Sequence, residues 1–276
     1  ILQQMIDTAV NELMKDLGEQ MPSTFIDKWN AWRYLSMLGN LRTHIRNLAG
    51  NAVFIPAIKC KNILAKAIEY ILPVEQRTKS VVVKKEYKDF AAKNFDAVYD
   101  ILTGNGKQNP SDAIRDNAKV FKTRWLENLR KLNFNALELE DAMFLKLHYV
   151  SALGGYLQAQ KVDLSNIDDA TLQKAQLYAI EEAQKATYRD ASAVASTLSK
   201  LSKQNMMANA LVEGVLPFKK TPVNVLKRSV EYSPIGLMKA ITFNVYALKK
   251  GDITASQFVD ALAGGLTGTG ISVLGF

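Results

Sequence analysis

The sequence predicts an all-α protein, an irregular multi-helix bundle of about ten helices. Three observations support this fold class. Apolar residues recur at three- and four-residue steps along nearly the whole chain, which is the spacing of helices with one buried face. No convincing β-hairpin pattern occurs, and no unit repeats at a fixed period, so a regular solenoid is not expected. The composition, 48% hydrophobic and 22% charged, is that of a globular protein with a core.

Start and stop signals divide the first hundred residues into five expected helices. Gly50-Asn51 ends a short polar and basic helix, Pro56 breaks the long apolar segment that follows, and Pro73 ends that segment. The loop Thr103–Pro110 then separates an N-terminal part, residues 1–102, from a C-terminal part, residues 111–276, unless the two parts form a single domain. The expected helices lie within residues 2–17, 25–38, 40–51, 52–72 and 87–102.

In the second half of the chain, capping residues predict the helix starts. Thr221-Pro222 and Ser233-Pro234 each place a capping hydroxyl before a proline at the first helical position. Thr254 with Gln257 fits a capping box, and Gly251 suits the end of the preceding helix. The remaining expected helices start after Ser111 and lie over residues 136–160 and 169–212.

The net charge of +8 is unevenly distributed. Residues 33–90 hold eleven Lys and Arg against four Asp and Glu, and such a segment can bind the phosphates of nucleic acids. Arg42 and Arg46 are one helical turn apart and share a face. The alternative is structural, in which Arg42, Arg46 and Asn47 order the connection over residues 39–51. The candidate nucleic-acid-binding residues are Arg33, Arg42, His44, Arg46, Lys59, Lys61 and Lys66.

The stretch Ala261–Phe276 has no charged residue and contains four glycines. Gly264 and Gly268 are spaced for close helix approach, either in a membrane or in a protein core. Sixteen residues are fewer than the roughly 20 that span a bilayer. We therefore expect the apolar side chains of the stretch to pack on the protein body. The candidate membrane or packing residues are Gly264, Gly268, Leu262, Leu266 and Ile271, and Leu274 is expected to pack with them.

No residue pattern identifies a catalytic or metal site. One cysteine and two histidines exclude a disulfide scaffold, a zinc finger and an iron–sulfur protein. We interpret Cys60 as incidental, His148 as a half-buried helix residue and Glu181-Glu182 as part of a solvated helix face. Gly104-Asn105-Gly106-Lys107 lacks the spacing of a phosphate loop. We expect no catalytic residue, metal or cofactor.

Several motifs resemble, in order, those of a known family. The long helical domain that they indicate is similar to the large polyvalent protein associated domains of phages and integrative elements. The motifs are Met37–Asn40, Arg42–Asn47, Gly50-Asn51, Arg77–Ser80, Leu126–Lys131, Leu216–Asn224, Tyr232–Pro234 and Gly265–Gly270.

The resemblance implies a non-enzymatic module of a virion-associated, DNA-delivery protein. Family members are very long polypeptides in which such a domain lies beside head-morphogenesis, nuclease, methylase or toxin domains. The implied partners are other domains of a longer polypeptide, DNA, a membrane, and capsid or portal components, and the implied location is the virion or the bacterial cytoplasm. The first residues hold no signal peptide, and the chain reads as an excerpt of a longer protein.

Two alternatives remain open at this point. One is a nucleic-acid-binding domain that uses the basic segment 33–90. The other is a membrane-active segment that inserts through the glycine-rich C-terminal stretch. An enzyme is the least favoured class, because no catalytic residue is attributed to this kind of module and none can be carried over.

Overall fold

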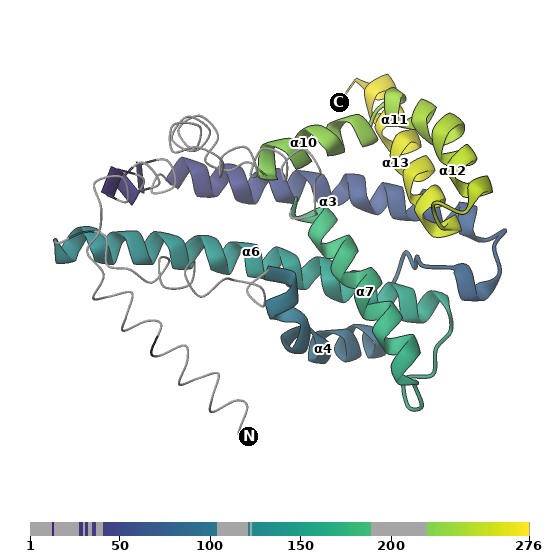
Figure 1. Ribbon diagram of the computed structural model, residues 1–276, viewed down its shortest axis with the longest axis horizontal. Helices are drawn as coiled ribbons and strands as arrows, with labels where there is room; N and C mark the ends of the chain where they lie inside the picture. Colours follow the sequence, from purple (N-terminus) through teal and green to yellow (C-terminus); the bar gives the residue numbers. More distant parts are fainter. Residues whose placement is uncertain are drawn as a thin grey trace. The chain divides into compact units, whose positions relative to one another are not determined.

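The computed structural model describes residues 41–103, 121, 123–188 and 220–275, together with positions 13, 28–29, 31–32 and 35–36. These residues contain eight α-helices and no β-strand, which confirms the all-α class for the described part of the chain (Figure 1). The expected number of about ten helices is not confirmed. The chain divides into two compact units, which we call unit 1 (residues 1–50 and 99–143) and unit 2 (residues 51–98 and 144–276).

This division differs from the expected consecutive parts 1–102 and 111–276. Each unit combines two separate stretches of sequence, because three long helices each contribute residues to both units. A helix of this length can take part in two packing units, and loop signals in a sequence do not reveal that. Residues 104–110 of the expected boundary loop lie outside the described residues. The three helices are α3 (Leu41–Glu69), α4 (Lys85–Thr103) and α6 (Arg124–Ala159).

Helix α3 is continuous where the sequence predicts interruptions. It runs through Gly50, Asn51 and Pro56, so the predicted helix end at Gly50-Asn51 and the predicted break at Pro56 are wrong. A proline inside a helix costs about 3 kcal/mol, but tertiary packing contributes more to helix stability than local propensity does. Downstream of Pro56, Ala65 packs with Val259 and Ala263 in a buried cluster that holds this part of the helix in place.

Helices α4, α6 and α7 (Asp169–Ala186) form one part of the core of unit 2. Aromatic rings join them, with Phe95 of α4 5.7 Å from Tyr149 of α6, and Tyr156 of α6 5.0 Å from Tyr178 of α7. The buried positions of α7 are all alanines, which let the neighbouring helices approach closely. These alanines are Ala175, Ala179 and Ala183.

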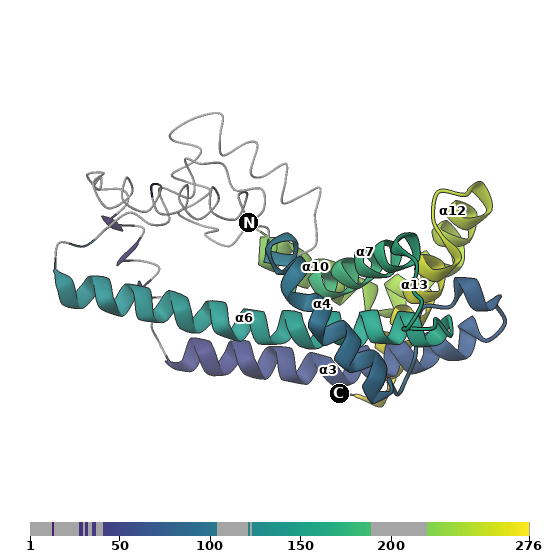
Figure 2. The same ribbon diagram turned by 90° about the horizontal axis from the view of Figure 1, so that it is seen from below.

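The other part of unit 2 is a helical hairpin whose two arms lie side by side in both views (Figures 1 and 2). The first arm is continuous, with a π-helical turn between α11 and α12, and Gly251 turns the chain with a left-handed φ of 82°. Helix α10 precedes the hairpin. The bounds are α10 Lys220–Glu231, α11 Pro234–Lys239, the π turn Ala240–Asn244, α12 Val245–Lys250 and α13 Ala255–Leu274.

Three of the capping predictions for this region are confirmed. The Ser233 side chain accepts from the Gly236 amide with Pro234 in the first turn, and Thr254 forms a capping box with Gln257. Gly251 ends the first arm as expected. The predicted start at Thr221-Pro222 is wrong, because α10 already includes Lys220.

Three glycines of α13, Gly264, Gly265 and Gly268, are buried, whereas some of its leucines are exposed. A Cβ at Gly265 or Gly268 would collide with the backbone of α11 or of the turn before it, so these glycines permit close contact between the two arms. Leu274, by contrast, is 74% exposed, and Leu266 is also exposed, so the expectation that they pack on the body is wrong. Gly264 is buried, and Leu262 and Ile271 are half-buried. No described helix combines the length and apolar character needed to cross a bilayer.

Candidate functional site

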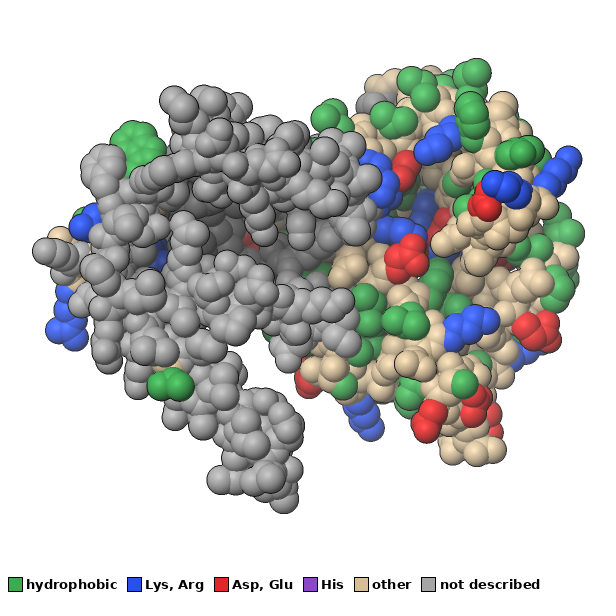
Figure 3. Space-filling view, in the orientation of Figure 1, with side chains coloured by type: hydrophobic (Ala, Val, Ile, Leu, Met, Phe, Trp, Pro, Cys, Tyr) green, Lys and Arg blue, Asp and Glu red, His purple; other side chains and the backbone are tan. Residues whose placement is uncertain are grey.

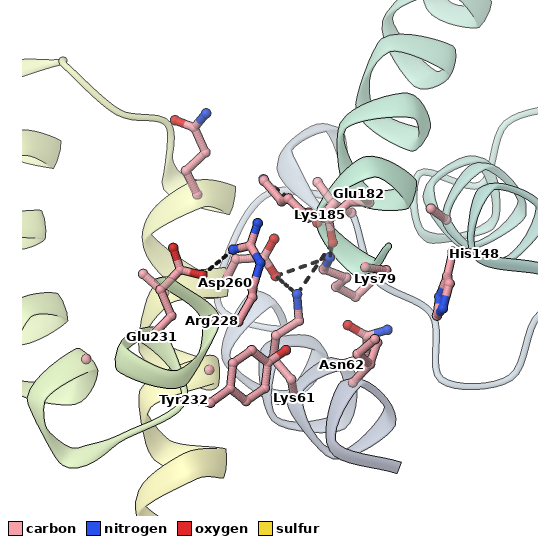
Figure 4. Close-up of a pocket in the computed structure, with 18 of the residues that line it drawn as sticks. Lys61, Asn62, Lys79, His148, Glu182, Lys185, Arg228, Glu231, Tyr232 and Asp260 are labelled. Atoms are coloured by element: carbon pink, nitrogen blue, oxygen red, sulfur yellow. Dashed lines mark hydrogen bonds and ion pairs between the residues drawn. The ribbon is translucent and has the colours of Figure 1, made fainter. Parts of the chain in front are cut away.

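Unit 2 contains a cavity of about 470 Å³, within the size range of small-molecule sites (Figure 4). Its wall comes from α3, residues 78–80, α6, α7, α10, α11, the π turn and α13. Among the described residues that line it, the basic groups outnumber the acidic groups by six to three. The basic residues are Lys61, Lys79, Lys185, Lys227, Arg228 and Lys239, and the acidic residues are Glu182, Glu231 and Asp260.

Lys61 enters the cavity from the buried face of α3. Phe54, Ile58, Lys61 and Ala65 follow one another at three- and four-residue steps, so the lysine occupies a position of the apolar face. Its side chain is only 12% exposed. The helix therefore places an ammonium group inside unit 2, where it needs carboxylate partners.

Lys79 is fixed by the turn that follows α3. The buried carboxylate of Glu69 accepts hydrogen bonds from the Thr78 and Lys79 amides at 2.9 and 2.8 Å, and from the Thr78 hydroxyl at 2.5 Å. Arg77 donates to the carbonyl oxygens of Leu72 and Tyr70, which satisfies acceptors at the end of α3. These bonds hold the backbone so that the Lys79 side chain points into the cavity.

The two lysines share the same two carboxylate oxygens. Lys79 Nζ lies 2.7 Å from Glu182 Oε2 and 3.1 Å from Asp260 Oδ1. Lys61 Nζ lies 3.4 and 3.3 Å from the same two oxygens (Figure 4). We call these four residues the charge quartet. It ties together α3, the segment 78–80, α7 and α13.

Ion pairing within the quartet keeps Lys61, Lys79 and Glu182 ionised. Burial alone would lower the pKa of Lys61 and Lys79, but the carboxylates of Asp260 and Glu182 outweigh it, so both pKa values are raised. Burial alone would raise the pKa of Glu182, but Lys61, Lys79 and Lys185 hold it well below its usual range. At neutral pH these lysines and Glu182 are therefore charged.

Two further basic residues of the cavity wall, Lys185 and Arg228, form ion pairs. Lys185 lies 3.2 Å from Glu182 Oε1 and 2.6 Å from Glu181 Oε1, so Glu182 contacts three lysines. Arg228 of α10 pairs with Glu231 one turn later on the same helix. Lys227 and Lys239 are exposed at the rim of the cavity.

The other titratable groups of the wall are neutral at pH 7. Burial lowers the pKa of His148 to about 4, with Glu182 opposing the shift and Lys61 adding to it. Burial also raises the pKa of Tyr178 and Tyr232. The interpretation of His148 as a half-buried helix residue is confirmed, since it is partly buried on α6.

The predicted nucleic-acid-binding residues do not form one site in the described structure. Lys61 is buried in the charge quartet, so its assignment to a nucleic-acid-binding surface is wrong. Lys59 and Lys66 are exposed on α3. Arg33 lies outside the described residues. The side chains of three candidates lie outside the described part, although their backbone belongs to α3: Arg42, His44 and Arg46.

The quartet is not evident from the sequence. The expectation that Glu181-Glu182 belongs to a solvated helix face is wrong for Glu182, whose side chain is 12% exposed. Two signals were present in the sequence: Lys61 interrupts an apolar helix face, and Asp260 is the only charged residue of α13. A lone charge on an apolar helix face indicates a buried pair but does not identify the partner.

The side chains of the cavity wall supply charged groups that ion pairs hold in place. Among the described residues, no group of three His, Cys, Asp or Glu side chains is placed to hold a metal ion. The exposed Cys60 is a free thiol on α3 and does not line the cavity.

Comparison with protein-family models, with curated proteins and with solved structures found no match to this chain.

Proposed function

We propose that this chain is a non-enzymatic helical module of a phage or prophage polyvalent protein, and that its own activity is to bind an anionic small molecule in the cavity of unit 2. The ligand class is a phosphate ester or a polycarboxylate with an apolar part. The resemblance described above supports the phage context, and the cavity supports the binding activity.

The excess of positive charge on the cavity wall is the observation that carries the binding proposal. Glu182 and Asp260 are engaged by the lysines of the quartet, and Glu231 is engaged by Arg228. The basic groups of the wall that are exposed to solvent are Lys227 and Lys239, at the rim. An anion at the rim would meet cations whose field the buried carboxylates only partly cancel.

The apolar residues of the wall suit an apolar ligand portion. They include Phe54 and Ile58 of α3 and Val230 of α10. The Phe54 ring packs edge-on against Tyr232 at 5.2 Å, so this ring is held by aromatic contact. Small-molecule sites commonly combine such an apolar wall with a few placed charges.

The protonation states favour binding over acid–base catalysis. A general acid or base works best with a pKa near the working pH. Here the pKa of His148 is about 4, that of Glu182 is well below its usual range, and those of the quartet lysines are raised. These groups hold one charge state at pH 7, which suits electrostatic recognition.

Titration calorimetry with inorganic phosphate, pyrophosphate and citrate tests the binding proposal. Lys227→Gln/Lys239→Gln should weaken binding of the preferred anion at least about tenfold, since a hydrogen bond to a charged group contributes about 1.5–3 kcal/mol. The matched control Lys174→Gln/Lys249→Gln removes two exposed lysines that do not line the cavity. It should bind like the unchanged chain.

Three results would contradict the binding proposal: no heat with any of these anions, equal weakening in both variants, or binding that survives the rim substitutions. Duplex DNA binding that excess phosphate does not compete would favour the basic segment 33–90 instead. The phage context has its own test, which is mass spectrometry of purified phage particles for peptides of this chain. Their absence from the particles would contradict a virion-associated role.

A further inference from the structure

The first arm of the hairpin, residues 234–250, presents a bare apolar face to solvent. Phe243 is 73% exposed and Tyr246 is 70% exposed, and Ile235 and Met238 are similarly exposed. We call these four side chains the apolar stripe. None of them lines the cavity, so the stripe is separate from the anion site proposed above.

The π turn keeps the stripe in line along the arm. The buried side of the arm repeats at four-residue steps through Gly236, Ala240, Asn244 and Leu248. In a plain α-helix each such step drifts by about 40° around the axis. The π turn over Ala240–Asn244 holds more residues per turn and removes part of this drift. The opposite, exposed side therefore remains one continuous face.

Lysines accompany the stripe. Lys239, Lys249 and Lys250 are exposed, and the sequence has no Asp or Glu between Tyr232 and Gly251. The first acidic residue after the arm, Asp252, lies 3.4 Å from Lys250. Figure 3 shows apolar side chains next to Lys and Arg side chains over the region of α11 and α12.

This geometry points to an anionic membrane surface as the partner of the apolar stripe. A bilayer interface accepts a helix that lies flat, with Phe and Tyr in the boundary of headgroups and acyl chains and lysines at the headgroups. The stripe lies on the exposed side of an arm whose other side packs on α13, so it suits insertion into a plane of lipid. Lys249 and Lys250, which do not line the cavity, give the charge that anionic lipids attract.

Vesicle co-sedimentation with the full chain tests this inference. The chain should bind phosphatidylcholine vesicles that contain about 30% phosphatidylglycerol, should bind pure phosphatidylcholine vesicles far less, and should be released by high salt. Phe243→Ser/Tyr246→Ser should reduce the partition coefficient at least about tenfold. Lys249→Gln/Lys250→Gln should reduce it about fivefold per lysine.

Control substitutions on α7 test whether vesicle binding requires the apolar stripe or follows from any exposed apolar and basic side chains. Leu177 and Lys174 are exposed on another face of unit 2, and Leu177→Ser/Lys174→Gln should leave vesicle binding unchanged. Circular dichroism checks that each variant keeps its helix content, and phosphate calorimetry checks that the cavity of the Phe243→Ser/Tyr246→Ser variant is intact.

Several outcomes would overturn the inference. They are failure to bind anionic vesicles, equal binding to neutral vesicles, and unchanged binding by the stripe variants. Sedimentation velocity gives one more: a stable dimer that Phe243→Ser dissociates, with no vesicle binding, would assign the stripe to a second copy of the chain. Loss of phosphate binding with intact vesicle binding would contradict only the proposed cavity function.

Discussion

Acidification should destabilise the protein through His148, because burial lowers the pKa of this side chain. The side chain is partly buried on α6, on the wall of the cavity, and the charged groups that act on it are Glu182 of α7 and Lys61 of α3. The perturbation is a drop in pH from 7.5 to 4.5, with His148→Gln as the variant that cannot take up the proton.

The magnitude follows from the two pKa values. An unfolded histidine titrates near 6.5, and burial lowers the pKa of His148 to about 4 in the folded protein. Because the folded pKa is the lower one, the unfolded chain binds the proton first, and stability falls as the pH drops from about 6.5 to about 4. At about 1.4 kcal/mol per pH unit, the full loss is about 3 kcal/mol, and most of it is complete at pH 4.5.

Urea unfolding followed by circular dichroism at pH 7.5, 6, 5 and 4.5 measures this loss. The unchanged chain should lose about 2–3 kcal/mol more than His148→Gln between the two ends of the range, because carboxylate titration is common to both proteins. An NMR titration should place the histidine resonance that is missing from the variant near pH 4.

Parallel stability curves for the two proteins would exclude this role of His148. A His148 resonance that titrates near 6.5 would exclude it as well, since burial would then not lower the pKa of the side chain. A larger loss in the variant than in the unchanged chain would reverse the predicted sign.

Three further predictions concern the charge quartet, the glycines of α13 and the cap of that helix. Lys79→Met leaves two buried carboxylates short of a cation and should cost about 3–5 kcal/mol in urea unfolding; adding Asp260→Leu should recover part of that loss, and a further loss would contradict the pairing. Gly268→Ala should cost about 1–3 kcal/mol because its Cβ meets the backbone, whereas Gly270→Ala, with open space around it, should gain about 0.5–1 kcal/mol; similar melting temperatures for the two variants would exclude this account. Thr254→Ala removes the capping box and should cost about 1 kcal/mol, and an unchanged melting temperature would show that the box contributes nothing.

The features that sequence reasoning predicted correctly depend on neighbours a few residues away. The caps at Ser233 and Thr254 and the left-handed Gly251 need only local hydrogen bonds and backbone freedom. The predicted breaks at Gly50-Asn51 and Pro56 are wrong because they also rest on local signals. At these positions, packing against residues distant in the sequence determines whether the helix continues. A helix that packs on another element can contain residues that would end it in isolation.

The site could not be predicted because its partners are distant in the sequence. Lys61 and Glu182 are 121 positions apart, and Asp260 comes from a third helix. Periodicity places Lys61 on an apolar face and therefore indicates a buried partner. It does not say which of the 27 acidic residues supplies the carboxylate, since this depends on how the helices cross.

The charge quartet and the proposed ligand have different electrostatic roles. Buried ion pairs contribute little net stability compared with apolar residues of similar size, because desolvation offsets the attraction. Their effect is to fix the position of the helices: a shift of α13 by one turn, about 5.4 Å, would separate Asp260 from both lysines. An anion that displaced Glu182 or Asp260 from these lysines would leave a buried carboxylate unpaired. The ligand should therefore bind at the rim near Lys227 and Lys239, while the ion pairs of the quartet stay intact and keep the helices of the cavity wall in place.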